Sequence, residues 1–489
     1  MNFQKMQKEK LSNTQKQKDF TKYRIDHWNR LWQRGDSRHG LSGYYYNRLS
    51  EVYNFLIPPG LKVIEIGCGN GDLLSSVKPS FGVGVDFSEV SARRAAKRHP
   101  ELHILIADAH NLRAIKGTFD VVILSDLVND LFDVQKALIE IRRMVHRRSR
   151  ITLNTHSKLW EYPLSVSAKL KLTRTRIVPN WLTVKDIENL LHLADFEMIR
   201  HWEEVLLPVK IPIITSLVNK FIVRLPVCRA FALTNMIVAR PSPGSNNSTV
   251  SPSVSIIIPA RNEAGNIQAI FERTPEIGSS SELIFVEGGS TDSTAETIRE
   301  HIRTHPERNC RLVTQKGKGK GDAVLLGFSV ATGDILMILD ADLTVKPEDL
   351  PRFYDAIKGH KGDFANGVRL VYPMENESMQ FVNLLGNKFF SYAFSWLLGQ
   401  PLKDSLCGTK ALWRDDYLLI AANRGYFGNF DPFGDFDLLF GAAKLGLRII
   451  DIPVRYGARK YGSTNIHRWK HGWMLLKMMT IAAFRIKFI

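Results

Sequence analysis

A run rich in proline, serine, glycine and asparagine divides this chain into two halves of nearly equal length. The run is PSPGSNNSTVSPS, residues 241–253, and its composition favours a flexible surface linker. On both sides of it, short β-branched segments alternate with helical patterns, which is typical of parallel α/β sheets. Because 489 residues are too many for one ordinary core, the sequence predicts two α/β domains, at residues 1–240 and 254–489, joined by this linker.

The first half contains a glycine-rich turn in the segment LKVIEIGCGNGDLL, which indicates a buried strand followed by a helix. Its glycines stand at alternate positions: Gly67, Gly69 and Gly71. Glycine lets the backbone turn tightly and approach a ligand that a β-carbon would exclude. A dinucleotide fingerprint GxGxxG would need glycine at position 72, where Asp72 stands, and it lacks the acidic residue before the turn, here Glu65.

This ExGxGxG segment resembles the class I S-adenosylmethionine-dependent methyltransferases, and the resemblance covers about residues 40–240. It implies a Rossmann-like methyltransferase fold and S-adenosyl-L-methionine as cofactor. A second apolar strand ends in Asp86, about 19 residues after the first glycine, where a carboxylate can accept both ribose hydroxyls. A third strand, in LHILIADAHNL, ends in Asp108, which by resemblance faces the adenine amino group with Ala109 beside it.

The later elements of this half are a helix over 134–145, a strand over 150–155 and closing strands near 196–203 and 234–240. Four polar residues fall on loops at the expected rim of the site: Asp126, Asn129, His156 and Tyr162. Structural or substrate-positioning roles are more typical of such residues than the role of a base. The Asn/Asp-Pro-Pro-Tyr/Phe motif of amide and base N-methyltransferases is absent, because SDLVND occupies its position, so the methyl acceptor stays open.

The second half opens with SVSIIIPARNEAGNI, an apolar strand that runs into a polar loop and a helix. It resembles the opening of family 2 glycosyltransferases, with their motif at Pro259, Arg261, Asn262 and Glu263. The resemblance covers about residues 253–470 and implies a GT-A fold, with these residues holding the base and ribose of a nucleotide sugar. In the next segment, ELIFVEGGSTDSTAE, Glu287 takes the place of the first aspartate of the family, Gly288 replaces the second, and Thr291 and Asp292 are expected at a helix cap.

The segment QKGKGKGDAVLLGFSVATGDILMILDADL carries the most specific pattern of this half. Lysines alternate with glycines at Lys316, Lys318 and Lys320, which suits the binding of a diphosphate. An apolar strand follows and leads into Asp340 and Asp342, the DxD motif of the GT-A fold. Two carboxylates one residue apart can hold Mg²⁺ or Mn²⁺, which neutralises a leaving nucleoside diphosphate.

Three further segments resemble the polyprenyl-phosphate sugar synthases. The acceptor-side motif lies in GQPLKDSLCGTKALWR, with Asp404, Cys407, Gly408 and Lys410, and a helix-borne carboxylate follows at Asp437. The segment ARKYGSTNI resembles their Arg-x-Tyr-Gly-x-Ser-Lys, with Arg459, Tyr461, Gly462 and Thr464, but Asn465 replaces the lysine, whose contact Lys460 could supply. Arg455 and Arg459 are expected to hold a diphosphate or an acceptor phosphate.

The resemblance implies inversion at the anomeric carbon by in-line displacement. Asp342 is expected at the reacting centre, and Asp404 and Asp437 are candidates for acceptor activation. An acceptor that is already a phosphate needs no strong base, because it is ionised at neutral pH.

The net charge of +17 is spread unevenly and indicates an anionic partner. Residues 1–250 hold 37 basic and 23 acidic side chains, and residues 455–489 hold eight basic side chains and no acidic one. Apolar segments at 205–227, 381–402 and 469–489 are each interrupted by Lys, Arg or Asn, which favours lying on a membrane or in a core over crossing a bilayer. We therefore expect peripheral membrane contact through the tail or, equally, a core or oligomer role for it.

Cys68, Cys228, Cys310 and Cys407 stand far apart with no zinc spacing, which indicates reduced thiols. The start MNFQKMQKEK lacks the apolar core of a signal peptide, so we expect a cytoplasmic protein, placed on the cytoplasmic face of the membrane if it binds one.

The leading hypothesis is a bifunctional transferase of polysaccharide, glycolipid or polyprenyl-linked sugar assembly. Two alternatives stand beside it: an RNA methyltransferase with an attached binding module, and a membrane scaffold with an inactive glycosyl site. The missing amide/base motif argues against nucleic acid as the partner, and the DxD pattern argues against a role in binding alone.

Overall fold

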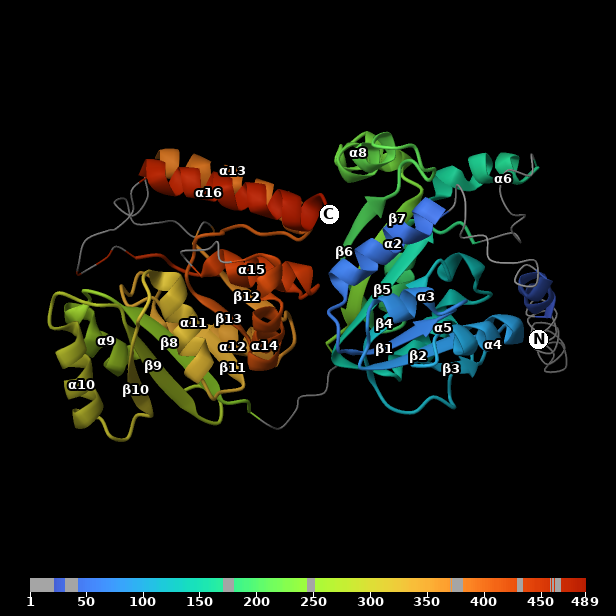
Figure 1. Ribbon diagram of the computed structural model, residues 1–489. Coiled ribbons are helices and arrows are strands. Elements are labelled where there is room, and N and C mark those ends of the chain that lie inside the picture. The colour runs from blue at the N-terminus through green and yellow to red at the C-terminus, as the bar shows by residue number, and fades with distance from the viewer. Residues whose placement is uncertain are drawn as a thin grey trace, which may run out of the picture. The chain divides into compact units, whose positions relative to one another are not determined.

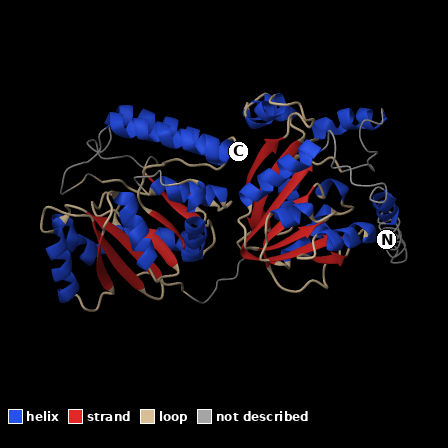
Figure 2. Ribbon diagram, in the orientation of Figure 1, coloured by secondary structure: helices blue, strands red, loops and turns tan. Residues whose placement is uncertain are grey.

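The computed structural model describes residues 22–30, 43–169, 180–243, 251–369, 371, 381–428, 434–457, 459, 461 and 468–489. The chain forms two compact units, Met1–Gly244 and Ser245–Ile489. Each unit is a seven-stranded sheet covered by helices, which confirms the α/β expectation for both halves (Figures 1 and 2).

The sheet of the first unit has the strand order β3-β2-β1-β4-β5-β7-β6. Its strands are β1 (Lys62–Ile66), β2 (Phe81–Asp86), β3 (His103–Ile106), β4 (Phe119–Ser125), β5 (Val145–His156), β6 (Phe196–Glu204) and β7 (Thr234–Pro241). Only β7 runs antiparallel to its neighbours, so the carboxyl ends of β1, β2, β3 and β4 meet at one edge. Parallel α/β sheets bind ligands at that edge.

The helices of the first unit begin with a helical segment over residues 22–30. They continue with α2 (Gly43–Leu56), α3 (Asp72–Ser76), α4 (Glu89–Arg98), α5 (Val134–Arg142), α6 (Glu161–Lys169), α7 (Val184–Leu193) and α8 (Ile214–Lys220). Helix α5 is shorter than the expected helix over 134–145, and β5 begins five residues before the expected position 150. The pairing with β4 jumps from Val145 opposite Phe119 to Arg150 opposite Val121, so residues 146–149 form an irregular stretch of the strand.

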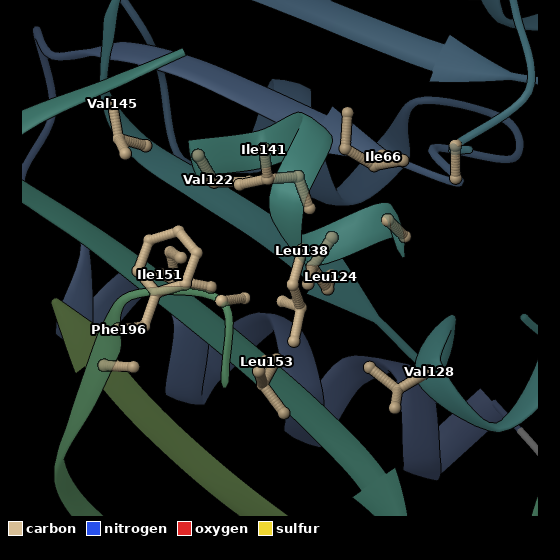
Figure 3. Packing of buried hydrophobic residues seen from close by; sticks show 14 of the residues in the cluster. Ile66, Val122, Leu124, Val128, Leu138, Ile141, Val145, Ile151, Leu153 and Phe196 are labelled. Carbon is tan, nitrogen blue, oxygen red and sulfur yellow. The ribbon is translucent and has the colours of Figure 1, made fainter. Parts of the chain in front are cut away.

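The core of the first unit fills the space between its sheet and α5 and α7. Figure 3 shows Val122, Leu124, Ile151 and Leu153 on the strands facing Ile141 and Leu138 on α5, with Phe196 closing the far side. These side chains alternate along each strand with residues of the other face, as period-two geometry requires. The core fixes the strand ends that carry the polar side chains of the site.

The sheet of the second unit has the strand order β10-β9-β8-β11-β13-β12-β14. Its strands are β8 (Val254–Ala260), β9 (Ser281–Glu287), β10 (Cys310–Thr314), β11 (Ile335–Ile338), β12 (Phe364–Val368), β13 (Lys410–Trp413) and β14 (Ile449–Pro453). Strand β13 runs antiparallel to both β11 and β12, and the other pairs are parallel.

The helices of the second unit are α9 (Ala264–Arg273), α10 (Thr294–Thr304), α11 (Lys320–Val330), α12 (Leu350–Lys358), α13 (Phe381–Leu398), α14 (Arg414–Ala422), α15 (Asp435–Lys444) and α16 (Arg468–Ala482). The cap of α10 differs from the expectation: Ser293 is the N-cap, and Asp292 instead accepts a hydrogen bond from the Thr294 N–H (3.0 Å). Helices α13 and α16 pack side by side (Figure 1). None of the helices in the described part of the chain is long and apolar enough to cross a bilayer.

Candidate active sites

A pocket lies at the carboxyl edge of the first sheet, where four parallel strands end. Each strand end contributes one carboxylate to its wall: Glu65 from β1, Asp86 from β2, Asp108 after β3 and Asp126 after β4. Gly67, Gly69 and Ala109 also line the pocket. The structure therefore brings together every cofactor residue expected from the sequence except Gly71, which is the N-cap of α3.

The three glycines of the turn all have positive φ angles, which L side chains adopt only at a cost. Space is also short: a β-carbon on Gly67 would lie 2.9 Å from Leu127 Cδ1. The buried Glu65 carboxylate accepts a hydrogen bond from the Leu74 N–H (3.1 Å) and so caps the helix that the turn starts. These residues give the turn its shape and bring its backbone to the pocket wall.

Asp86 is held in place by two backbone hydrogen bonds. Its Oδ2 accepts from the Gly69 N–H (2.9 Å) and its Oδ1 from the Ser88 N–H (2.8 Å). The side chain is buried, and burial raises the pKa of the carboxyl from 3.8 to about 6 although both hydrogen bonds oppose the rise. The two hydrogen bonds thus do not offset the cost of burying the charged carboxylate, and further donors from a ligand would favour its charged form.

Asp108 stands on the same edge and contacts His110. Its Oδ1 lies 2.5 Å from His110 Nδ1 and accepts from the His110 N–H (2.9 Å). Burial alone would raise the pKa of Asp108, but the hydrogen bonds from His110 outweigh it and hold that pKa below its ordinary value. Asp108 therefore stays ionised and presents an acceptor to the pocket.

One wall of the pocket comes from a segment that the sequence left unassigned. Arg24 and Trp28 of the helical segment 22–30 line it, together with residues of α2. The nearly buried Arg24 pairs with Asp130 (2.5 Å), and Ser88 Oγ donates to Asn29 Oδ1 (2.5 Å). The sequence signal for this segment was Trp28. It lies before residue 40, where the family resemblance begins, and follows a stretch rich in Lys and Gln.

The four expected rim residues have different surroundings. Asp126 Oδ1 accepts hydrogen bonds from Tyr45 Oη (2.8 Å) and Asn154 Nδ2 (2.6 Å), and His156 Nδ1 lies 3.6 Å from it. Asn129 donates to the Asn180 carbonyl (2.7 Å) and accepts from the His156 N–H (3.0 Å), so it joins two loops. Tyr162 is 79% exposed on α6. Of the four, only Asp126 lines the pocket.

In the second unit, the ends of β8 and β9 form one polar surface. Ala260 pairs with Glu287 in the sheet, and Pro259 lies one residue earlier in β8. Asn262, with φ +57°, accepts from the Thr291 N–H (2.8 Å), and its own N–H donates to Ser290 Oγ (3.1 Å). The two expected nucleotide loops are therefore joined directly.

Glu287 is buried at this surface, and its Oε1 accepts from the Ser290 N–H (2.5 Å). Burial works to raise its pKa, but the hydrogen bonds from Ser290 and Gly289 outweigh it and lower that pKa. A β-carbon on Gly288 would lie 3.2 Å from Gln315 Oε1, so the position of the missing second aspartate has little room for a side chain. Arg261 beside it is exposed.

The two aspartates of the DxD pattern lie just after β11, and each forms an ion pair with a basic side chain. Asp340 pairs with Lys320 at the first turn of α11 (2.6 Å), and Asp342 pairs with Arg459 (2.7 Å). Burial raises the pKa of Asp340 despite the nearby lysine. For Asp342 burial acts in the same direction, but hydrogen bonds from Arg459 and Thr344 prevail and its pKa is lowered.

These two carboxylates fit a hard divalent cation. Magnesium is usually held by one or two carboxylates together with substrate phosphates and water, so a site of this type needs no cage of protein ligands. The described residues contain no group of three or more His, Cys, Asp and Glu side chains arranged for a metal. Asp340 and Asp342 are the residues that would hold Mg²⁺ or Mn²⁺ here.

The acceptor-side motif approaches the same centre. A β-carbon on Gly408 would lie 2.1 Å from both Asp340 Oδ2 and Lys320 Nζ, so a larger residue would have to displace this ion pair. Two residues on, the fully buried Lys410 pairs with Asp435 (3.2 Å), the first residue of α15. Sequence reasoning missed Asp435 and chose Asp437. The sequence signal was Gly434, directly before Asp435: it is the N-cap of α15 with a φ of +77°, and a β-carbon there would lie 2.8 Å from the Gly321 α-carbon.

The two candidates for acceptor activation are both ion-paired. Asp404 is buried and receives a bidentate pair from Arg369, with Nε at 2.7 Å and Nη2 at 2.9 Å. Burial would raise its pKa, but Arg369 holds it below the ordinary value. Asp437 pairs with Arg424 (2.8 Å). Neither arrangement leaves an obvious free base.

Of the remaining expected contacts, Lys316, Lys318 and Arg455 have exposed side chains. Arg459 contacts Asp342 and also lies 3.7 Å from Glu263, which links the second arginine motif to the first nucleotide loop. Lys460, Gly462, Thr464 and Asn465 lie outside the described residues.

Comparison with known protein families identifies both units. Residues 57–198 match the model of a methyltransferase domain, and residues 255–418 match that of glycosyl transferase family 2. The chain thus contains a methyltransferase domain followed by a family 2 glycosyltransferase domain.

Two curated relatives match the second unit. A dolichol-phosphate mannosyltransferase of Pyrococcus furiosus is 30% identical over 219 residues, covering 44% of this chain and 59% of the relative. An undecaprenyl-phosphate 4-deoxy-4-formamido-L-arabinose transferase of Edwardsiella ictaluri is 25% identical over 228 residues, covering 46% of this chain and 64% of the relative. The chain therefore spans about three fifths of the length of these relatives. Among solved structures, an S-adenosylmethionine dependent methyltransferase from Mesorhizobium loti is similar to the first unit at 17% identity and a TM-score of 0.31, covering 39% of this chain and 96% of that one.

Proposed function

We propose that this chain, which carries a methyltransferase domain and a family 2 glycosyltransferase domain, is a bifunctional enzyme of polyprenyl-linked sugar or glycolipid assembly. The second unit would transfer a sugar from a nucleoside diphosphate donor to a polyprenyl phosphate or a related glycolipid acceptor, in a metal-dependent inverting reaction. The first would methylate the same product, or a related one, with S-adenosyl-L-methionine. The proposed place of action is the cytoplasmic face of a membrane.

The observation that carries the glycosyl proposal is that Asp340 and Asp342 each form an ion pair with a basic side chain. Lys320 and Arg459 neutralise these carboxylates in the free protein. A donor diphosphate that arrives with a divalent cation offers each group a new partner, since the carboxylates can turn to the cation and the two basic side chains to the phosphates. When bound, the metal would neutralise charge on the leaving nucleoside diphosphate. Four charged groups are thus kept at the reacting centre without leaving a buried charge unpaired.

The nucleotide part of the donor has a place beside this centre. Asn262, Glu287 and the exposed Arg261 lie at the ends of adjacent strands, and Glu287 is kept ionised by backbone hydrogen bonds. An ionised carboxylate can accept hydrogen bonds from ribose hydroxyls or a base N–H. Because Gly288 leaves this surface without a second carboxylate, we propose that Glu287 alone performs this role.

The acceptor needs no general base if it is a phosphate. The bidentate pair with Arg369 occupies both oxygens of Asp404, so we propose a positioning role for it, holding the loop that brings Gly408 to Asp340. Lys410 and Asp435 would support the same loop from beneath. Asp437 is proposed to orient the start of α15 through Arg424.

The methyl-transfer proposal rests on the four carboxylates at the edge of the first sheet. Asp86 would accept the two ribose hydroxyls, Asp108 the adenine amino group, and the glycine turn would bring backbone N–H groups to the ligand. The sulfonium supplies an activated methyl group, so the chain need only align the acceptor and take its proton. Asp126, with His156 at 3.6 Å, is the candidate for that proton.

Peripheral membrane contact of the second unit is supported by α13 and α16. Exposed aromatic side chains gather on these packed helices, including Phe389, Tyr392, Trp396 and Trp473. Lys487 lies over the Trp396 ring (5.0 Å), which places a cation at the edge of this apolar surface. Such a surface suits the headgroup layer from which a polyprenyl phosphate is taken.

A donor screen tests the glycosyl part of the proposal. Thermal unfolding of the full chain is followed with a panel of nucleotide sugars, each with and without Mn²⁺. We expect stabilisation by one donor class only when the metal is present, and its loss in Asp342→Ala. A wild-type chain that no nucleotide sugar stabilises would contradict the proposal.

A further inference from the structure

Residues 205–233 form an insertion between β6 and β7 whose polarity is inverted. In α8, the side chains that point into the protein are Thr215 and Asn219, which are 2% and 0% exposed. The side chains that point outward are large and apolar, with Ile213, Ile214 and Leu217 exposed by 78%, 52% and 51%. A helix on the surface of a water-soluble domain normally has the opposite arrangement.

The inward polar groups organise the insertion and are fully used. Asn219 Oδ1 accepts from the N–H groups of Leu206 (2.7 Å) and Leu207 (2.9 Å), and its amide donates to the Leu207 carbonyl (2.8 Å). Thr215 Oγ1 accepts from the Ile211 N–H (2.8 Å) and donates to the Val209 carbonyl (2.6 Å). The fold therefore fixes which face of α8 is inside, and the apolar face cannot turn inward without breaking these bonds.

The outward face continues beyond α8. The short turns that follow it expose Leu225 (53%), Val227 (74%) and Phe231 (58%). At the start of the helix, Ile213 combines its exposure with a φ of +64°, a conformation that is strained for a β-branched residue. Exposed apolar surface of this extent marks a contact site.

The charges of the insertion all have one sign. Four basic residues, Lys210, Lys220, Arg224 and Arg229, lie within it, and residues 205–233 contain no acidic one. Lys210 and Arg229 are exposed. A second copy of this surface would place like charges opposite one another, whereas the anionic headgroups of a bilayer would complement them. The combination of apolar and basic side chains therefore fits an anionic lipid surface.

The insertion lies at the edge of the sheet that carries the cofactor pocket. It joins Glu204 to Thr234, which pairs in the sheet with His156 at the end of β5, and Figure 1 shows α8 and α6 beyond this edge. The buried Glu204 binds Arg224 of the insertion (2.5 Å) and Arg48 of α2 (3.1 Å). Helix α2 also supplies residues to the pocket wall.

We propose that residues 205–231 dock the methyltransferase unit on an anionic bilayer, so that its methyl acceptor is a lipid or a lipid-linked molecule presented at that surface. This inference rests on the proposed methyl transfer for the identity of the acceptor, but the docking itself does not. Helix α6 extends the surface: Tyr162 is exposed on it, and the Trp160 indole donates to the Phe231 carbonyl (2.8 Å). The segment that leads into α6 and the docking surface are thus joined by a hydrogen bond.

Vesicle co-sedimentation of the full chain tests the docking. Wild type, Ile213→Asp/Val227→Asp and the matched control Ile139→Asp/Leu193→Asp, whose side chains are 47% and 52% exposed on α5 and α7, are compared on vesicles of phosphatidylcholine with and without phosphatidylserine. The comparison is then repeated with Trp473→Asp added to each chain, so that the second unit contributes less. We expect the double variant to bind phosphatidylserine vesicles about tenfold more weakly than the control, and wild-type binding to fall as salt rises.

Two further readouts separate the other outcomes. Stabilisation of the double variant by S-adenosyl-L-homocysteine shows that its fold and pocket are intact. If the wild type is not stabilised by this ligand, the proposed methyl transfer is contradicted, but the vesicle result still decides the docking. Equal vesicle binding by the double variant and the control would overturn the proposal. So would protection of Ile213–Leu217 amides from hydrogen exchange beyond helical values without vesicles, or a dimer that the double variant dissociates, because each would show that protein covers this surface.

Discussion

Because burial raises the pKa of Asp86, we expect cofactor binding and folding stability to respond to pH in opposite directions. The pKa of this buried group in the free protein is about 6, against 3.8 for the ordinary carboxyl. If the cofactor hydroxyls bind only the carboxylate, affinity is reduced by the fraction that is ionised. At pH 5.0 about one molecule in eleven is ionised, so affinity for S-adenosyl-L-homocysteine should fall about tenfold between pH 7.5 and pH 5.0.

The raised pKa of Asp86 also determines how the free energy of unfolding changes with pH. A carboxyl whose pKa is higher in the folded state takes up its proton earlier there, so its contribution rises as pH falls through 6 toward 4 and is lost as pH rises. The full shift corresponds to about 3 kcal/mol, and about 1.4 kcal/mol of it should be recovered by pH 5.0. Asp86→Asn removes both dependences, because it cannot titrate.

Titration calorimetry and denaturant unfolding at pH 7.5, 6.0 and 5.0 measure the two effects. His103→Gln is the matched control: it removes an exposed titratable side chain that does not line the pocket and should keep both trends. A control of binding by Asp86 is refuted if the wild type binds S-adenosyl-L-homocysteine with the same affinity at all three pH values. It is also refuted if Asp86→Asn shows the same pH dependence as the wild type.

Three further substitutions follow from individual contacts. Glu204→Gln removes the buried carboxylate that Arg48 and Arg224 share, while Arg48 keeps its pair with the exposed Glu51, and should destabilise the first unit by about 3–5 kcal/mol in denaturant unfolding; a loss under 1 kcal/mol would show that water reaches this cluster. Gly408→Ala forces a β-carbon into the Asp340–Lys320 pair and should lower kcat for sugar transfer about 100-fold while thermal unfolding of the chain changes little; unchanged kcat would mean that the loop is free to withdraw. Lys318→Ala removes an exposed cation beside this pair and should raise KM for the donor about tenfold at constant stability, an effect that should shrink for a donor lacking the β-phosphate.

The architecture could be predicted because strand and turn signals are local. The buried apolar runs, the glycine turn before Asp72 and the acidic strand ends each depend on a few adjacent residues, and the parallel sheet then brings Glu65, Asp86 and Asp108 to one edge. The same logic placed Asp340 beyond the end of an apolar strand.

What the sequence could not supply are contacts between distant segments. Nothing in the neighbourhood of Asp404 indicates that Arg369 occupies both its oxygens, and nothing near Lys320 shows that Gly408 lies against it. The inversion of α8 was hidden for a similar reason: a mixture of apolar and polar residues reads as a core or a membrane helix until the burial of Asn219 shows which face is inside.

Release of nucleoside diphosphate tests most directly whether the second unit transfers a sugar to a lipid phosphate. The full chain is incubated with the donor that stabilises it, Mn²⁺ and a short polyprenyl phosphate in vesicles, beside Asp342→Ala. We expect release that requires both the metal and the lipid phosphate and is lost in the variant. Release that is independent of the lipid phosphate, or equal in Asp342→Ala, would contradict this expectation.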